Sequence, residues 1–321
     1  MTEFFSVACD GWKLNGLVHV PAPAPARRVG VVLLHENINT KFGTHRLLRQ
    51  LAEALAQAGF YVLRYDDRGT CDSPGECELT VSDRVADACA VFMAFRRQYQ
   101  LDSLVAWGLC LGAAVAVLSN PRCERKARAE AMILCSILAD PAIVSGAEFG
   151  YEPVNVSSIL RNSVLAENPV RKLYRVVRKF CMVREYRRQI RKVATLLARR
   201  YFGGETGLRR RRKEIARVSG LLAAHRGPCL MIFGERDPYW TNFTRRVNPN
   251  DKLGLTKRNP CWNWVLVKDG DHTFASAEQT AELIHYTVEW ARAFRDGSPE
   301  QIVGLYPEQM IHGIFAASVA E

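Results

Sequence analysis

A cysteine lies between two glycines where the chain pattern changes from strand to helix. The stretch is Gly108-Leu-Cys110-Leu-Gly112, which follows the apolar run 103–107. A nucleophile on a sharp strand–turn–helix junction needs small residues two positions away, so that strand and helix can approach each other. Glycine at 108 and 112 meets that need. At a helix N-terminus, the helix dipole also favours the thiolate, which is the nucleophilic form of cysteine.

The chemistry that this turn predicts is attack by Cys110 on an acyl carbon to give a covalent thioester. The backbone N–H of Leu111 would point at the same space and would stabilise the oxyanion that forms there. The alternative is a buried cysteine in a glycine-containing turn. The turn alone leaves both interpretations open, so the surrounding elements have to decide between them.

The elements around this turn predict an α/β fold. Residues 3–20 are typical of an antiparallel strand pair with a turn at Asp10-Gly11. Further strands are predicted at 28–36, 60–67, 103–109, 130–138, 228–234 and 262–269. Helices are predicted around 48–55, at 79–97 and 111–119, and from Ser276 onward, where Ser276 and Gln279 would form a capping box. Such alternation indicates a mostly parallel central sheet with helices on both faces.

Composition limits the class of protein. The chain has 321 residues, of which 48% are hydrophobic, and no run of 18 apolar residues predicts a membrane-spanning helix. The N-terminal residues lack the pattern of a signal peptide, so we expect a cytoplasmic protein with reduced thiols. The ten cysteines form no CxxC pair and no zinc-ligand spacing, so we expect neither a metal nor a cofactor.

One segment makes this chain basic. The formal net charge is +11, yet residues 171–217 alone hold 18 Lys and Arg against three Glu. The predicted strands stop at about residue 140 and resume at 228. Within 140–224, Leu173, Val176, Val177, Phe180 and Val183 recur at helical spacing between cations, which predicts an amphipathic helix.

Four further motifs give the chain a family resemblance. "LLHENINT" resembles the HG loop after the third strand of the α/β-hydrolases, and "YDDRGTCDS" resembles their D-x-R-G-x-G-x-S turn. "GERD" and "DGDHTF" resemble the loops that carry the acid and the histidine. Within this superfamily the chain is most similar to the small hydrolases encoded beside exosortase and exopolysaccharide genes. Dienelactone hydrolases and the acyl-CoA thioesterase and N-acyltransferase group also use cysteine at this turn.

The resemblance implies an α/β-hydrolase fold and a triad in the family's chain order. Cys110 corresponds to the nucleophile, Asp237 to the orienting acid and His272 to the base. Asp140 is the alternative acid, because it follows the preceding strand, where some members of the family place that residue. Asp271, beside the histidine, is expected to lie behind the site or on the surface rather than to act as the acid.

The resemblance also implies an oxyanion hole formed by the backbone N–H groups of Leu111 and Asn37. Two positions depart from the family pattern. Glu36 stands where the family has glycine, and a carboxylate beside an oxyanion is unfavourable, so Glu36 must point away or act on the substrate. Cys71 stands where the family prefers glycine. Arg68, Asp72 and Ser73 are expected to be structural residues of that turn.

The implied domain organisation is a core of residues 1–139 and 225–321 with a basic helical cap at 140–224. Its charge, with Arg209, Arg210, Arg211 and Arg212 as candidate contacts, suits an acidic acyl carrier protein, an anionic membrane surface or an acidic substrate. A solvated charged face is the simpler interpretation. The chain would then be located in the cytoplasm or at the inner membrane surface. No nucleic-acid-binding motif is present, so nucleic acid is not an expected partner.

Two functions follow. The first is hydrolysis or acyl transfer on an ester or thioester through a cysteinyl acyl-enzyme, as a thioesterase or acyltransferase would perform it. The second is a non-catalytic protein of the same fold that binds an acidic partner or anionic membrane through its basic cap. The triad favours the first, whereas Glu36 in the oxyanion loop favours the second.

Overall fold

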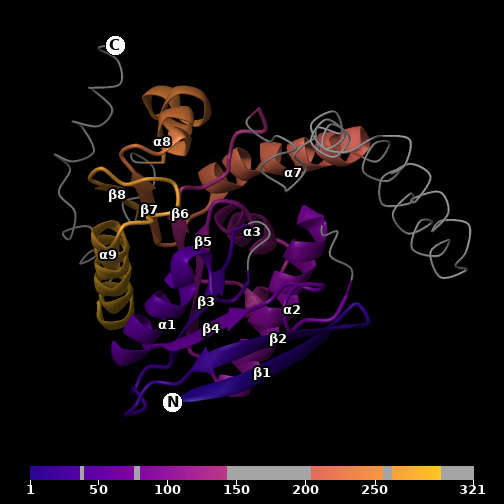
Figure 1. Ribbon diagram of the computed structural model, residues 1–321, viewed down its shortest axis with the longest axis vertical. Coiled ribbons are helices and arrows are strands. Elements are labelled where there is room, and N and C mark those ends of the chain that lie inside the picture. The colour runs from indigo at the N-terminus through magenta and orange to yellow at the C-terminus, as the bar shows by residue number, and fades with distance from the viewer. Residues whose placement is uncertain (37–39, 76–79, 143–203, 256–261, 298–321) are drawn as a thin grey trace, which may run out of the picture. The chain divides into compact units, whose positions relative to one another are not determined.

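A computed structural model of the chain describes residues 1–36, 40–75, 80–142, 204–255 and 262–297 (Figure 1). The chain divides into two compact units, one of residues 1–141 and 213–321 and the other of residues 142–212. The predicted helix at 173–183 and Asn37 lie outside the described residues. The first unit holds all of the strands described below.

The centre of this unit is one eight-stranded sheet in the order β1-β2-β4-β3-β5-β6-β7-β8. β1 and β2 pair antiparallel, as do β2 and β4, whereas all neighbours from β4 to β8 run parallel. The strands are β1 (Thr2–Cys9), β2 (Trp12–His19), β3 (Val29–Leu34), β4 (Tyr61–Tyr65), β5 (Ser103–Leu109), β6 (Ala131–Cys135), β7 (Cys229–Gly234) and β8 (Trp262–Val267). The predicted α/β-hydrolase fold with a mostly parallel sheet is therefore confirmed.

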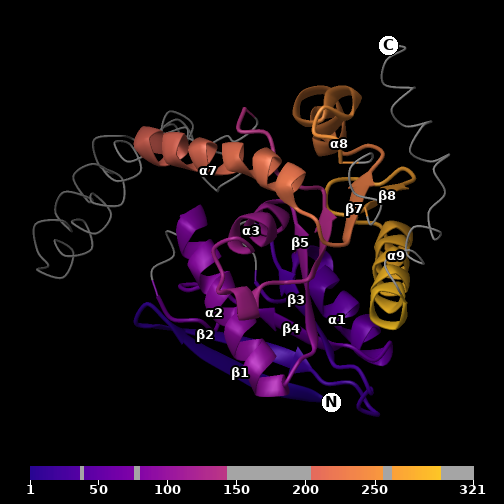
Figure 2. The same cartoon turned by 180° about the vertical axis from the view of Figure 1, so that it is seen from behind.

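Helices cover both faces of the sheet. α1 and α9 lie together on one face, and α2 and α3 lie together on the other (Figures 1 and 2). The α-helices are α1 (Leu47–Gln57), α2 (Val81–Tyr99), α3 (Leu111–Ser119), α7 (Gly204–Ala224), α8 (Pro238–Asn242) and α9 (Ala277–Asp296). Short 3-10 turns lie at Thr44–Arg46, Arg125–Ala127 and Pro249–Asp251, and one π turn lies at Phe243–Val247.

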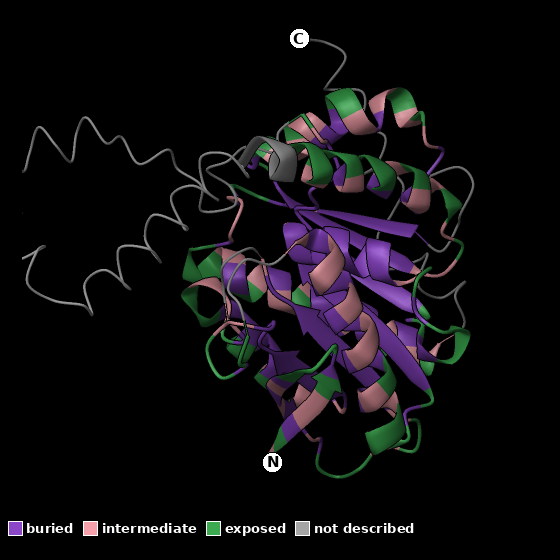
Figure 3. Ribbon diagram, turned by 90° about the vertical axis from the view of Figure 1, so that its right-hand side faces the viewer, coloured by how far each residue is buried: buried purple, intermediate pink, exposed green. Residues whose placement is uncertain are grey.

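The burial pattern explains this layering. β3, β4, β5, β6 and β7 are buried along their whole length, because helices cover them from both sides (Figure 3). α3 is buried at every position, whereas α1 buries one face. That face holds the predicted Leu48, Leu51 and Leu55 together with Leu47 and Ala52. The carboxyl ends of the six parallel strands β4, β3, β5, β6, β7 and β8 meet at one edge of the sheet.

The helix starts differ in one detail from the sequence prediction. At α9, the Ser276 side chain accepts from the Gln279 backbone N–H, as expected. The Gln279 side chain does not return the bond to Ser276. Its amide nitrogen donates to the Asp269 carbonyl at 2.9 Å, which ties the helix to the turn after β8. The reciprocal capping box lies instead at α2, between Thr80 and Asp83.

The α2 capping box generates a stability prediction. Thr80→Ala removes the side chain that accepts from the Asp83 N–H, so the first turn of α2 loses one hydrogen bond. We expect the free energy of unfolding, measured by urea denaturation, to fall by about 1 kcal/mol. Thr80→Ser keeps the hydroxyl and should stay close to the wild type. Equal losses in the two variants would contradict this interpretation of the cap.

Candidate active site

Cys110 occupies the sharp turn between β5 and α3. Its φ of 54° and ψ of −113° lie outside the ordinary regions for a residue with a side chain. The surrounding main chain holds this conformation, because the Cys110 N–H donates to the Cys135 carbonyl at 2.9 Å and the Cys110 carbonyl accepts from the N–H groups of Leu138 and Ala114. The sulfur-bearing residue is half-buried rather than sealed in the core.

The two neighbouring glycines have the steric role that the sequence predicts. A β-carbon on Gly108 would overlap the main chain of Gly112 and Ala113, where α3 begins. A β-carbon on Gly112 would overlap the carbonyl oxygens of Leu34 and His35, at the end of β3. The main chain of the turn lies in direct contact with the carboxyl end of β3. Only glycine fits at these two positions, because a β-carbon would overlap that main chain.

His272 and Asp237 lie together although 35 positions separate them in the chain. Asp237 follows β7 and caps α8, and its side chain is fully buried. The His272 ring lies in the turn after β8, with Nδ1 at 3.0 and 3.2 Å from the two Asp237 carboxylate oxygens. The Cys110 side chain is also close enough to the ring to help raise the pKa of His272. The three residues predicted as a triad are thus brought into one connected arrangement, and their catalytic roles stay a prediction.

The charges around His272 favour its protonated form. Burial by itself lowers the pKa of the imidazole, but the hydrogen bonds with Asp237 and Cys110 and the negative charge near the ring outweigh it. The pKa of His272 is raised to about 10. An imidazolium beside a sulfur stabilises a thiolate, which is the arrangement that a cysteine nucleophile requires.

Tyr239 is a residue of this arrangement that the sequence analysis missed. Its ring lies 4.2 Å from the His272 ring, centroid to centroid, at an interplanar angle of 30°. Its backbone N–H donates to Asp237 Oδ1 at 2.9 Å. Tyr239 therefore restrains both the acid and the histidine. The signal was its position two residues after Asp237, where an N-capping carboxylate accepts from the main chain.

The alternative acid, Asp140, has other partners. Its carboxylate accepts a hydrogen bond from the Asn242 side chain at 2.8 Å and lies 3.6 Å from the Arg246 guanidinium. The carboxylate in contact with His272 is that of Asp237. Asp271 accepts from the N–H groups of Thr273 and Ala275, so it shapes the loop that carries the histidine.

Of the two predicted oxyanion donors, one is described. Leu111 is the first residue of α3, directly after the turn. Glu36, the departure from the family pattern, has its carboxylate engaged by Thr44: the Thr44 N–H donates to Oε1 at 3.1 Å and the Thr44 hydroxyl donates to the same oxygen. This contact gives Glu36 a structural partner in the turn before α1.

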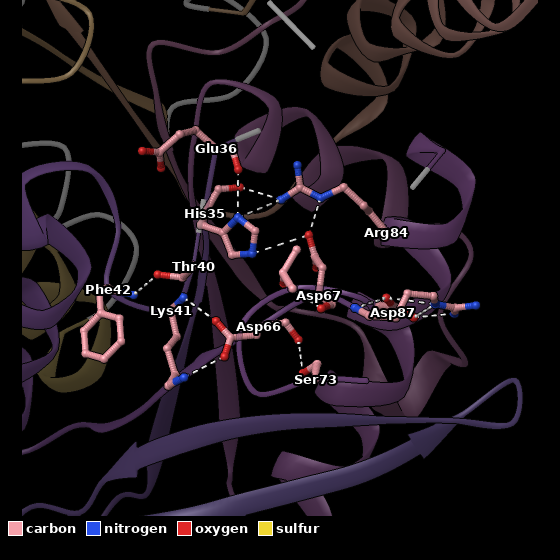
Figure 4. A network of polar contacts seen from close by, with 12 residues as sticks. His35, Glu36, Thr40, Lys41, Phe42, Asp66, Asp67, Ser73, Arg84 and Asp87 are labelled. Carbon is pink, nitrogen blue, oxygen red and sulfur yellow. Dashed lines mark hydrogen bonds and ion pairs between the residues drawn. The ribbon is translucent and has the colours of Figure 1, made fainter. Parts of the chain in front are cut away.

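A buried polar network lies behind the end of β3 (Figure 4). The Arg84 guanidinium donates to the His35 carbonyl at 2.6 Å and pairs with Asp67 at 2.6 Å. His35 Nε2 lies 3.4 Å from the same Asp67 carboxylate. The sequence analysis did not single out Arg84 or Asp67. The only signal in the sequence was the position of each residue. Asp67 is the second residue of the D-x-R-G turn, and Arg84 is a charged residue on a mostly apolar face of a helix.

Among the described residues, one group of acidic and thiol side chains is close enough together to hold a metal ion, and Lys41 lies beside it. Asp66, Cys71 and Asp72 have ligand atoms close together. The Lys41 ammonium lies 2.6 Å from Asp66 and 2.5 Å from Asp72, where a cation would have to bind. The lysine ammonium thus pairs with both carboxylates at that place. Cys71 has a φ of 43°, the left-handed conformation that explains the family's preference for glycine there.

The basic region is described only in its last part. Arg209, Arg210 and Arg212 are exposed on α7 and Arg211 is half-buried. From residue 213 onward α7 belongs to the first unit, where Ile215, Val218 and Leu222 are buried. The division therefore falls inside the region 140–224 that the sequence assigns to a cap, and that assignment stays a prediction. No helix among the described residues combines the length and apolar character needed to cross a membrane.

Comparison with known proteins identifies the family. Residues 42–244 match the Hydrolase_4 family model, described as serine aminopeptidase, S33. The chain belongs to this α/β-hydrolase family. Its description names a serine enzyme, whereas this chain has Cys110 at the turn after β5. The Cys110 turn and Asp237 lie inside the matched region, and His272 lies beyond it.

The curated relatives match a shorter stretch. Lysophosphatidylserine lipase ABHD12 of Mus musculus is 35% identical over 107 residues, which are 32% of this chain and 25% of the relative. The Xenopus tropicalis protein of the same name is 33% identical over 105 residues, 32% of this chain and 26% of the relative. The match therefore spans about a quarter of the length of these relatives.

Solved structures share the fold over most of the chain. Est1E from Butyrivibrio proteoclasticus aligns with a TM-score of 0.55 at 16% identity, covering 89% of this chain and 98% of that one. The Pyrococcus furiosus esterase Pf2001 aligns with a TM-score of 0.56 at 17% identity, over 90% and 91% of the two chains. At this identity the likeness shows the fold alone.

The contact between His272 and Asp237 generates a titration prediction. Asp237→Asn removes the negative charge that raises the pKa of His272, so the pKa should fall from about 10 toward its ordinary value of 6.5. Asp140→Asn is the matched control, because Asp140 contacts Asn242 and Arg246 instead. NMR titration of the His272 ring would measure both variants. A fall in Asp140→Asn alone would assign the acid to Asp140.

The same ionisation predicts a pH dependence of stability. The pKa of folded His272 lies above its ordinary value, so the protonated ring stabilises the fold. That contribution is complete below about pH 6.5 and is lost as the pH rises through about 10. Between pH 7 and 10, the free energy of unfolding of the wild type should therefore fall relative to that of Asp237→Asn. Parallel pH profiles would contradict the raised pKa.

Proposed function

We propose that this protein is a hydrolase or acyltransferase that acts on an ester or thioester through a covalent intermediate on Cys110. The observation that carries the proposal is the connected arrangement of Cys110 on its positive-φ turn, the His272 imidazole and the buried Asp237. Membership of the hydrolase family supports the same reaction class.

The proposed reaction has two halves. The Cys110 thiolate attacks the acyl carbon, so that a carbon–sulfur bond forms and the bond to the leaving oxygen or sulfur breaks. The leaving group takes its proton from the His272 imidazolium. His272 then accepts a proton from water or another nucleophile, which attacks the thioester and returns Cys110 to the thiolate. Asp237 fixes the ring orientation through Nδ1 and stabilises the imidazolium.

The oxyanion is assigned to the backbone N–H of Leu111 and to a second donor, for which the sequence proposes Asn37. Leu111 N–H lies at the start of α3, where main-chain N–H groups have no partner inside the helix. The acyl group, the acceptor and a gene neighbourhood of the exosortase type stay predictions.

A test of this proposal follows the covalent intermediate directly. With 4-nitrophenyl acetate, intact-protein mass spectrometry of the wild type should show one acetyl group on Cys110, and Cys110→Ala should show none there. His272→Gln should form the adduct at least tenfold more slowly, because the sulfur loses its imidazolium partner. Peptide mapping separates Cys110 from the exposed Cys71, which serves as an internal reference for general thiol reactivity.

The outcome is informative in either direction. Acetylation of Cys71 at an unchanged rate in His272→Gln would show that the loss is specific to the site. If an ester and thioester panel leaves Cys110 unmodified in the wild type, the proposed reaction is wrong. The fold assignment would be unaffected, because it rests on the sheet and the family match.

The exposed arginines of α7 favour a second candidate function, which is binding of an anionic membrane surface. Arg209, Arg210 and Arg212 are exposed and Arg211 is half-buried, and cations near an anionic bilayer contribute roughly 1 kcal/mol each. An acidic carrier protein is the other partner that this charge suits. This function is compatible with catalysis, because it concerns residues other than those around Cys110.

Vesicle binding tests this second function. The wild type should sediment with anionic phospholipid vesicles and much less with zwitterionic ones, and binding should weaken as salt rises. Replacing Arg209 to Arg212 with Ser should abolish most of the binding. The control variant replaces three exposed cations elsewhere, namely Arg122, Arg125 and Lys126. Equal losses of binding in the two variants would show that vesicle binding depends on net charge and not on these arginines of α7.

A further inference from the structure

The main chain at the end of β3 is held from two sides. On one side the His35 carbonyl accepts from Arg84 Nη2 at 2.6 Å. On the other side it lies against the α-carbon of Gly112, where a β-carbon would overlap it. Gly112 is two residues after Cys110, so the position of the His35 carbonyl is directly coupled to the position of the turn.

Asp67 fixes the guanidinium that makes this contact. Its carboxylate lies 2.6 Å from Arg84 Nε and 3.4 Å from His35 Nε2, and both side chains of the Arg84–Asp67 pair are at least 95% buried. Figure 4 shows the Arg84 side chain reaching from α2 across to the His35 carbonyl, with Asp67 directly below it. A buried pair of this kind allows little freedom, since a guanidinium that leaves it becomes an unpaired buried charge.

The His35 side chain extends the restraint to the next residue. Its Nδ1 lies 2.7 Å from the Glu36 carbonyl oxygen. The Glu36 carboxylate, in turn, accepts from Thr44. In Figure 4 that carboxylate points away from Arg84. Both carbonyls of the His35-Glu36 segment are therefore in polar contact with buried or half-buried side chains.

We infer that Arg84 is a positioning residue that sets the main chain of His35 and Glu36 against the Cys110 turn. The inference rests on the proposed function, because the turn that this segment packs against holds Cys110 and the Leu111 N–H assigned to the oxyanion. Displacement of a main-chain donor by a fraction of an ångström weakens an oxyanion hydrogen bond, which acts mainly on the transition state. Loss of Arg84 should then slow acylation and leave substrate binding nearly unchanged.

The chain offers a matched control in Arg68. Its guanidinium pairs with Asp87 on α2, one turn beyond Arg84, and joins the same loop and helix. Its guanidinium contacts Asp87, Asp10 and Cys9, none of which belongs to the His35-Glu36 segment. Arg84→Lys and Arg68→Lys both keep the charge and shorten the hydrogen-bonding reach.

Two measurements on the full chain test the inference. Hydrogen–deuterium exchange resolved to the amides of His35, Glu36 and Thr44 reports the segment without any substrate. Single-turnover acetylation of Cys110 by 4-nitrophenyl acetate, with its dependence on ester concentration, reports catalysis. We expect Arg84→Lys to exchange faster at these amides and to be acetylated at least tenfold more slowly with little change in half-saturation. Arg68→Lys should resemble the wild type in both.

Each other outcome has a defined meaning. Unchanged exchange in Arg84→Lys would overturn the inference whatever the activity, and faster exchange with normal acetylation would overturn the catalytic role. Equal effects in Arg84→Lys and Arg68→Lys would overturn the inference, because Arg84 would then contribute only to the stability of the fold. If the wild type forms no acyl-enzyme with any donor, the proposed function fails. The exchange measurement would then still decide whether Arg84 holds the segment.

Discussion

The structure around Cys110 depends on one steric constraint, the contact of the main chain after β5 with the main chain at the end of β3. Gly112 permits this contact, since any side chain there would overlap the Leu34 and His35 carbonyls. Gly108 permits the turn to fold back on the start of α3. The positive φ of Cys110 is an unfavourable backbone conformation, which the surrounding packing holds in place. In return, the sulfur lies at the carboxyl edge of the sheet and at a helix N-terminus.

Charge pairs anchor the loops behind this edge. The tripeptide Asp66-Asp67-Arg68 follows β4, and each residue takes a different partner: Lys41, Arg84 and Asp87 in turn. Buried pairs of this kind contribute little net stability against an apolar replacement, but breaking one is costly. Their effect here is geometric. They tie the segment after β3, the segment after β4 and helix α2 to one another at fixed distances.

Much of the fold was predictable from the sequence, because its signals are local. Buried strands such as 103–109 and the leucine stripe of α1 have the expected apolar patterns, and the glycines around Cys110 predicted the close approach that the structure contains. The contact of Asp237 with His272 needed the family's chain order, because it joins two loops whose separation in space no local pattern encodes.

The residues that sequence analysis missed share a different property. Arg84, Asp67 and Lys41 act through partners from other elements, and their own neighbours in the chain give no sign of it. Tyr239 has a local sign in its spacing from Asp237, but its contact with the His272 ring joins two loops. Arg84 is a charged residue on the buried side of α2, which local patterning treats as an exception to the apolar face. Such an exception is informative only once the partner is known, because a buried charge requires one.

The same reasoning bears on the glutamate that replaces the family's glycine. A carboxylate at position 36 would oppose an oxyanion nearby by several kcal/mol if it were buried and uncompensated. Thr44 in the turn before α1 instead donates to this carboxylate, which points away from Arg84 (Figure 4). Arg84 places a positive charge 2.6 Å from the adjacent carbonyl, with Asp67 balancing that charge on its other side. The carboxylate of Glu36 and the guanidinium of Arg84 therefore lie on opposite sides of the His35-Glu36 segment, and the carboxylate has a hydrogen-bond donor of its own in Thr44.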